Sequence, residues 1–129
     1  MKINEITSII IEESIYIHKS LGPGLFESVY EEILFYRLLK RGLRLDRQLG
    51  IPVKFEEVDM NIGFRADIIV ESKVLIEIKS LEVLPKIAEM QVMTYLRLTG
   101  IQIGLLINFN SEKLIDGLKR IANNYNPED

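Results

Sequence analysis

The sequence contains no cysteine, which excludes disulfide bonds and metal sites built from thiolates. This composition fits a reducing compartment, and we expect a cytoplasmic protein. The chain also lacks any apolar run near the ~20 residues that cross a bilayer. Its first residues, MKINEITSIIIEES, mix acids with apolar residues and lack the small-residue cleavage site of a signal peptide. We therefore expect no membrane association.

An excess of positive charge is also absent, since the net charge is −3. This argues against a large surface that binds phosphates by charge alone. It leaves open a site where carboxylates hold a metal ion, because the ion neutralises them. The 129 residues, 47% of them apolar, contain no repeat, low-complexity tract or linker, so we expect one domain spanning residues 1–129.

The first third of the chain predicts two helices. Isoleucines at near-helical spacing indicate an amphipathic helix over 3–20, which ends at the Gly22-Pro23-Gly24 turn. A second helix over 25–41 is apolar on almost every side and ends at Gly42.

The rest of the chain predicts strands and two further helices. We expect a turn at 56–61, a helix from Pro85 to Leu98 and a last helix that begins at Ser111. The predicted strands cover 49–55, 63–70, 74–79 and 101–109. The predicted fold class is therefore α/β, in the order ααβββαβα, with a central mixed four-stranded sheet flanked by helices.

In the segment FRADIIVESKVLIEIKS, the alternation of side chains between the two faces of each strand fixes the register of a hairpin. It places Phe64, Ala66, Ile68 and Val70 on one face of the first strand. The apolar faces of both strands match only if Val70 lies opposite Val74, since a slip of one residue would invert one strand. Asp67 then lies opposite Glu77.

This pairing is costly, because carboxylates ~5 Å apart repel by roughly 3 kcal/mol at an effective dielectric constant near 20. Lys79, a shared proton or a divalent cation could neutralise them. A hard ion such as Mg²⁺ prefers oxygen ligands. The alternative is a solvated hairpin face on which Arg65 and Lys79 pair with the two acids.

Two helices carry further polar side chains at a spacing that puts them on one face. Gln91 and Tyr95 are four residues apart, as are Glu27 and Glu31, with Tyr30 beside them. A carboxylate among apolar positions is costly unless it is paired or binds metal. Each feature also has a simple alternative: a surface pair for Gln91 and Tyr95, and a favourable interaction of Glu27 with its helix dipole.

Taken in order, Asp67, Glu77-Ile-Lys79 and the Gln91-x-x-x-Tyr95 helix resemble the PD-(D/E)xK nuclease superfamily. More closely, they resemble its branch of recombination-type nucleases and CRISPR-associated exonucleases, in which a Q-x-x-x-Y helix follows the E-x-K strand. Gly24-x-x-Glu27-x-x-Tyr30 is similar to the signature of the GxxExxY family within it. His18 before LGPGL and the run GLLINF are also typical of that family. The resemblance covers nearly the whole chain, although Ala66 replaces the proline of the PD motif.

The resemblance implies a restriction-endonuclease-like core and a site that binds Mg²⁺ or Mn²⁺. The implied metal ligands are Asp67, Glu77, the carbonyl of Ile78 and Glu27, the last directly or through water. Lys79 would orient or activate the attacking water and offset charge on the phosphate. The other implied site residues are Gln91 and Tyr95, which would hold the scissile strand or metal-bound waters, and His18, Tyr30 and Glu31 as supporting groups around the ligands.

The resemblance predicts a metal-dependent nuclease that acts on nucleic acid, with DNA favoured over RNA. A homodimer and a larger complex are the two assemblies considered. The alternative is a catalytically silent nuclease-fold module that binds nucleic acid or a partner protein. His18 is equally well explained as a structural histidine. The basic residues Lys40, Arg41, Arg44 and Arg47 form either phosphate contacts or a solvated loop.

Overall fold

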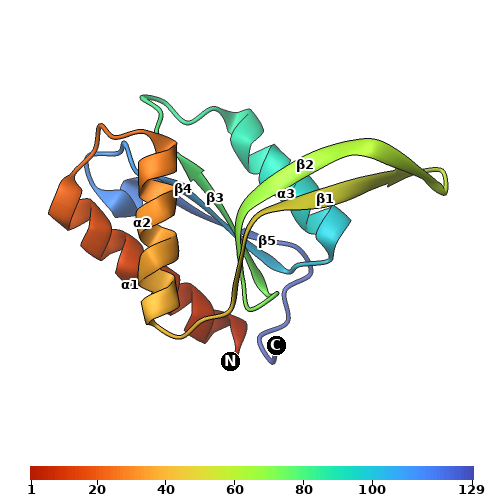
Figure 1. Ribbon diagram of the computed structural model, residues 1–129, viewed down its shortest axis with the longest axis horizontal. Helices are drawn as coiled ribbons and strands as arrows, with labels where there is room; N and C mark the ends of the chain where they lie inside the picture. The colour runs from red at the N-terminus through yellow and green to blue at the C-terminus, as the bar shows by residue number, and fades with distance from the viewer.

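A computed structural model describes residues 1–129, the side chains at positions 61 and 62 excepted. The chain forms three layers, with two helices on one face of a twisted sheet and one helix on the other (Figure 1). In chain order the elements are α1 (Ile3–Leu21), α2 (Glu27–Lys40), β1 (Leu45–Phe55), β2 (Val58–Val70), β3 (Val74–Lys79), α3 (Lys86–Thr99), β4 (Ile103–Asn108), the 3₁₀ helix η1 (Leu114–Gly117) and β5 (Leu118–Ala122).

The sheet has the strand order β1-β2-β3-β4-β5. Only β3 and β4 pair in parallel, and α3 connects them, so the predicted helical crossover is confirmed. The other neighbouring strands are antiparallel. The sheet is therefore mixed, as predicted, and its two central strands are buried on both faces.

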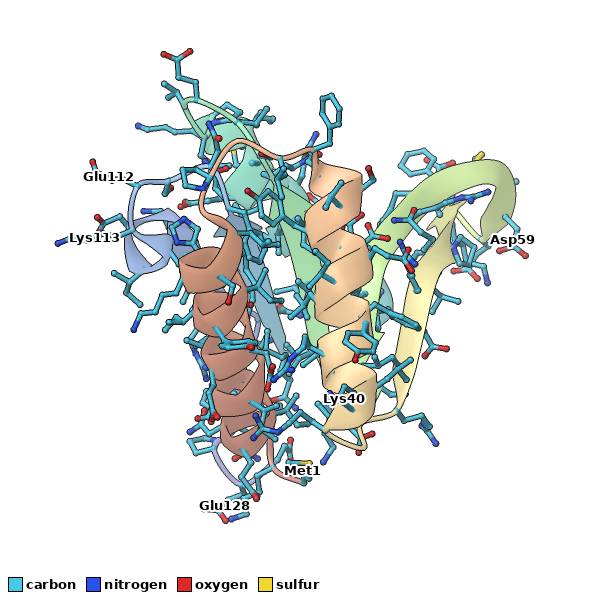
Figure 2. The ribbon with its side chains drawn as sticks, turned by 60° about the vertical axis from the view of Figure 1, so that its left-hand side comes forward. Met1, Lys40, Asp59, Glu112, Lys113 and Glu128 are labelled. Atoms are coloured by element: carbon cyan, nitrogen blue, oxygen red, sulfur yellow. The ribbon has the colours of Figure 1, made fainter. Side chains whose placement is uncertain are left out.

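Two apolar cores lie on opposite faces of this sheet. The larger core joins α1 and α2 to the sheet, and Figure 2 shows these two helices side by side in front of it. The smaller core joins α3 to the other face. There α3 packs closely on β4, because a Cβ atom at Gly104 would lie only 2.6 Å from Val92 Cγ1. Glycine at this position lets the helix approach the strand.

The predicted hairpin register is confirmed. Val70 pairs with Val74 and Ile68 with Ile76, and the loop between them contains three residues. Glu71 and Ser72 adopt positive φ in this loop, and the N–H of Lys73 donates to the carbonyl of Val70. The preceding turn is shorter than predicted, because β2 already begins at Val58.

The predicted last helix and the four-stranded sheet are both wrong. The segment after Ser111 forms the short helix η1 and then β5, which pairs antiparallel with β4 as a fifth strand. Leu114, Leu118 and Ile121 have helix-like spacing, but the buried strand β4 would otherwise leave backbone N–H and C=O groups unpaired at its edge. Pairing those groups outweighs the local preference for a helix.

Candidate active site

The ladder between β2 and β3 ends at the pair of Ile68 and Ile76, and two carboxylates lie just beyond it. Asp67 Oδ2 accepts a hydrogen bond of 2.8 Å from the backbone N–H of Ile78. The backbone N–H of Asp67 donates to Glu77 Oε1 at 3.3 Å. Side-chain oxygens thus replace the next ladder bonds. Asp67 and Glu77 lie beside each other on neighbouring strands, which is the arrangement that the register predicts.

The expected alternation along β2 breaks at this point. Ile68 and Val70 belong to the core under α1 and α2, as predicted, whereas Ala66 belongs to the core under α3. Phe64 stacks on Tyr95 of α3, with ring centroids 3.7 Å apart. The prediction that all four side chains share one face is therefore wrong, because the β1–β2 ribbon changes face at Asp67.

A strained residue in β1 lies beside this change of face. Gln48 has φ +52, and the pairing between β1 and β2 skips from Arg47–Ile68 to Leu49–Ala66. A left-handed conformation costs a non-glycine residue roughly 1 kcal/mol or more. Beyond this point the β1–β2 ribbon curves away from the rest of the sheet, and Figure 2 shows Asp59 near its outer end.

Burial and mutual repulsion make the two carboxylates difficult to ionise together. Glu77 is 7% exposed, and burial together with the negative charge of Asp67 raises its pKa to about 8. The pKa of Asp67 is also raised, chiefly by burial, while the hydrogen bond from Ile78 acts in the opposite direction. The positive charge of Lys79 lowers both pKa values. Among the described side chains, neither carboxylate forms an ion pair.

The start of α2 lies against the end of β3. Ser80, which directly follows Lys79 in the chain, donates a hydrogen bond of 2.6 Å from its Oγ to the carbonyl of Leu25. The hydroxyl of Tyr30 donates to the carbonyl of Gly22 and accepts from the N–H of Leu25, and its ring stacks on Phe109. Tyr30 therefore fixes the turn before α2, and its contribution to the site stays a prediction.

Glu27 is the first residue of α2 and follows Leu25, the residue that contacts Ser80, by two positions. Its side chain is half-buried. Its side chain forms no hydrogen bond with any described residue. The negative charge that acts on both Asp67 and Glu77 from α2 is that of Glu31, one turn further along. The contribution of Glu27 to the site stays a prediction.

Glu31 belongs to a polar chain of contacts that reaches Asp67. It is 7% exposed, and its Oε2 accepts from Arg47 Nε at 2.7 Å. Its Oε1 accepts from Gln48 Nε2 at 2.8 Å, and the same nitrogen donates to Asp67 Oδ1 at 3.2 Å. Gln48 is not among the site residues that the sequence predicts. Extending the strand register to β1, where Gln48 falls opposite Asp67, is the signal that would have found it.

The basic residues after α2 are engaged within the protein. Arg41 pairs with Glu12 and Glu13, and Arg47 pairs with Glu31 and Glu32. Arg44 donates a hydrogen bond to Ser72 Oγ. Arg41 thus joins the end of α2 to α1, and Arg47 joins β1 to α2. This pairing reduces the charge that the region can offer to phosphates.

The helix α3 brings Tyr95 into electrostatic reach of the carboxylates. Burial raises the pKa of Tyr95, and the negative charges of Glu77 and Asp67 raise it further. Gln91 lies one turn earlier and is exposed. Its contact with a substrate or metal-bound water stays a prediction.

His18 contacts a different part of the molecule. It is 7% exposed, and its Nε2 lies 2.7 Å from the carbonyl oxygen of Ser111. This contact joins the end of α1 to the segment after β4. The geometry is that of a structural histidine, the alternative that the sequence left open.

A family model of the PD-(D/E)XK nuclease superfamily matches residues 4–121 of the sequence. The chain belongs to this superfamily. Searches of curated proteins and of solved structures found no significant match. The match covers nearly all of α1, both carboxylates and most of β5, so almost the whole sheet falls within the PD-(D/E)XK domain. Within the described residues, no helix is long and apolar enough to cross a membrane.

The donor atoms of this PD-(D/E)XK site fit a hard divalent cation. The buried Glu77 and the half-buried Asp67 offer carboxylate oxygens whose repulsion a cation would relieve. Among the described residues, no three Asp, Glu, His or Cys side chains are placed to share one ion. Mg²⁺ commonly binds through one or two carboxylates, with waters and substrate phosphates completing its octahedron. Two carboxylates are therefore sufficient for an ion of this kind.

Proposed function

We propose that this protein is a metal-dependent nuclease that hydrolyses phosphodiester bonds, with DNA favoured over RNA as its substrate. One observation carries the proposal: the buried Glu77 and the half-buried Asp67 lie beside each other where β2 and β3 stop pairing, without an ion pair among the described residues. Lys79 follows Glu77 by two residues on β3. A structural ion-pair network would balance these charges. We also assign the chain to the GxxExxY family within the superfamily, on its Gly24, Glu27 and Tyr30 motif.

In this proposal Asp67, Glu77 and the carbonyl of Ile78 hold Mg²⁺ or Mn²⁺, and Glu27 adds a carboxylate directly or through water. The bound ion would polarise the phosphate and lower the pKa of a coordinated water. Lys79 orients that water and offsets negative charge on the phosphate. The docking of Leu25 on Ser80 supports the placement of Glu27, because it brings the start of α2 to the end of β3.

Tyr95 and Gln91 would hold the scissile strand from α3. The stacking of Tyr95 on Phe64 supports this role, since it keeps the phenol near the carboxylates. A surface hollow lined by Gly50, Phe64 and Arg65 lies along the β1–β2 ribbon, and Arg65 precedes Asp67 by two residues on β2. The exposed Arg65 offers a positive charge there for a phosphate of the bound strand.

A second candidate is a catalytically silent module that binds nucleic acid or a partner protein, as a homodimer or within a larger complex. The ion pairs of Arg41 and Arg47 with glutamates of the protein favour it, because paired arginines contribute little to binding a phosphate backbone. The complete set of Asp67, Glu77 and Lys79 favours the enzyme, since a silent relative has no catalytic reason to keep all three.

A cleavage assay separates the two candidates. Single-stranded and duplex DNA and RNA of the same sequence are incubated with the protein in Mg²⁺, in Mn²⁺ and in a chelator. We expect cleavage that requires the metal, that is lost in Asp67→Asn, and that is faster on DNA. Binding of nucleic acid without cleavage under every condition would instead support the silent module.

A further inference from the structure

We propose that Gln48 is a positioning residue that holds the carboxylate of Asp67 in the orientation needed for cation binding, with Glu31 as its anchor. This inference rests on the proposed metal site, and it adds a residue to that site. Gln48 and Glu31 come from β1 and α2, whereas the two acidic ligands come from β2 and β3.

The backbone at Gln48 is the first observation. Gln48 has φ +52 inside β1, whereas the other non-glycine residues with positive φ among those described lie in turns or bends. No tight turn requires this conformation, because Arg47 and Leu49 on either side both pair with β2. A strained conformation persists only where surrounding contacts enforce it, and such positions cluster at functional sites.

The side chain of Gln48 is the second observation. Its Nε2 lies 2.8 Å from Glu31 Oε1 and 3.2 Å from Asp67 Oδ1. Both partners are carboxylate groups, so the amide turns its NH₂ group between them and gives one hydrogen to each. Arg47 fixes the other oxygen of Glu31, at 2.7 Å. The anchor is buried and is held by Arg47 independently of Gln48, so it sets the position of the amide.

The consequence falls on Asp67. Its Oδ1 accepts from Gln48, and its Oδ2 accepts from the N–H of Ile78. Hydrogen bonds to both oxygens define the plane of the carboxylate, whereas a single bond would leave it free to turn. Partners of this kind orient the ligands of metal sites and affect metal affinity.

A simpler role for these contacts is to join β1 to α2. That role predicts a general loss of stability when Gln48 is changed, with no effect confined to Asp67. The positioning role predicts that the bond from Ile78 to Asp67 weakens and that cation affinity falls, while the rest of the sheet stays protected.

The test compares Gln48→Gly with Glu57→Gly. Both replace a residue of positive φ by glycine, which tolerates that conformation, but Glu57 (φ +66) lies in the turn between β1 and β2, ahead of the first residue of β2. Gln48→Glu is a third variant, which keeps the length of the side chain and replaces the donor by an acceptor. Amide hydrogen exchange is measured without metal, and Mn²⁺ affinity is measured by calorimetry.

In Gln48→Gly and Gln48→Glu we expect the Ile78 amide to exchange at least about tenfold faster relative to Leu106 of β4, and Mn²⁺ affinity to fall about 10- to 100-fold. Glu57→Gly should match the wild type in both measurements. An unchanged ratio of Ile78 to Leu106 exchange overturns the proposal, as does unchanged Mn²⁺ affinity. If the wild type binds no Mn²⁺, the proposed function fails, and the Ile78 amide alone then decides whether Gln48 holds Asp67.

Discussion

Glu13 and Glu77 are both buried glutamates, 3% and 7% exposed, but their pKa values shift in opposite directions. Glu13 on α1 lies between Arg37 and Arg41, with contacts of 2.6 and 2.8 Å. Burial alone would raise its pKa, but the hydrogen bonds and charges of the two arginines outweigh burial and lower it. Glu77 faces Asp67 instead, and its pKa rises to about 8.

The difference separates an acid that stabilises the fold from one that is costly to it. The Glu13 cluster satisfies its own charges and joins α1 to α2. At the end of the β2–β3 ladder, the negative charges of Asp67 and Glu77 face one another, and burial penalises both. A buried site with unbalanced charge is a candidate functional site. The predictions below test this comparison.

The largest loss of cleavage activity should follow from replacing Lys79, whose charge acts on both site carboxylates. Lys79→Ala should lower the rate of metal-dependent cleavage about 100-fold or more, the usual loss when one group that stabilises transition-state charge is removed. Steady-state cleavage of a labelled DNA measures this loss. Lys86→Ala, at an exposed lysine that begins α3, should cleave at the wild-type rate. A loss below about threefold in Lys79→Ala would exclude a catalytic role.

The two glutamates should give stability opposite pH dependences. Because the pKa of Glu77 is higher in the folded protein than in the unfolded chain, its stabilising contribution is complete below about pH 4.5 and is lost as the pH rises through about 8. The total change is on the order of a few kcal/mol, since each pKa unit corresponds to ~1.36 kcal/mol. The lowered pKa of Glu13 has the opposite consequence: its contribution is present above about pH 4.5 and is lost in acid.

Urea unfolding of the metal-free protein between pH 3 and pH 9 measures both contributions. Glu77→Gln should remove the decline between pH 5 and pH 8, and Glu13→Gln should reduce the loss in acid. A wild-type stability that rises from pH 5 to pH 8, or a decline that Glu77→Gln leaves intact, would contradict the assignment to Glu77.

At neutral pH the two substitutions should also differ in size and sign. Glu13→Gln removes charged hydrogen bonds to two arginines and should cost about 2 kcal/mol of unfolding free energy. Glu77→Gln removes the cost of burying an acid that is ionised in the unfolded chain at this pH, so it should leave the metal-free protein unchanged or more stable. Thermal unfolding at pH 7 compares them directly. Equal destabilisation by both would mean that the two acids do not differ in the way that their surroundings indicate.

The smallest expected effect concerns Glu27. If it contributes to the metal site, Glu27→Gln should lower metal-dependent cleavage about tenfold while thermal stability stays near that of the wild type. Glu32→Gln is the matched control on the same helix, because the carboxylate of Glu32 is 69% exposed and its ion pair with Arg47 should contribute less than about 1 kcal/mol. Equal activity of both variants would exclude Glu27 from the metal site, and its role would then be a favourable interaction with its helix dipole.

Local rules predicted the elements that alternation and turn residues define. Val70 and Val74 fix the hairpin because a slip of one residue would expose an apolar face. Pro85 and Gly100 delimit α3. The same register placed Asp67 and Glu77 on neighbouring strands, so the acidic pair could be predicted from the sequence before any contact was known.

The remaining features depend on contacts between distant parts of the chain. Strand β5 forms because β4 offers an unpaired edge, which helix-like spacing after Ser111 cannot reveal. The change of face at Asp67 depends on the positive φ of Gln48, and a glutamine in the sequence does not indicate that conformation. The role of Arg47 is likewise visible only once Glu31 lies beside β1.

Metal-dependent thermal unfolding tests the central claim, that the acidic pair is a cation site, most directly. In Mg²⁺ or Mn²⁺ the melting temperature of the wild type should rise with concentration, because a ligand that binds only the folded state stabilises it by about 2.7 kcal/mol at 100 times its Kd. Asp67→Asn and Glu77→Gln should abolish this rise. Equal metal-induced shifts in all three proteins, or no shift in the wild type, would contradict the account.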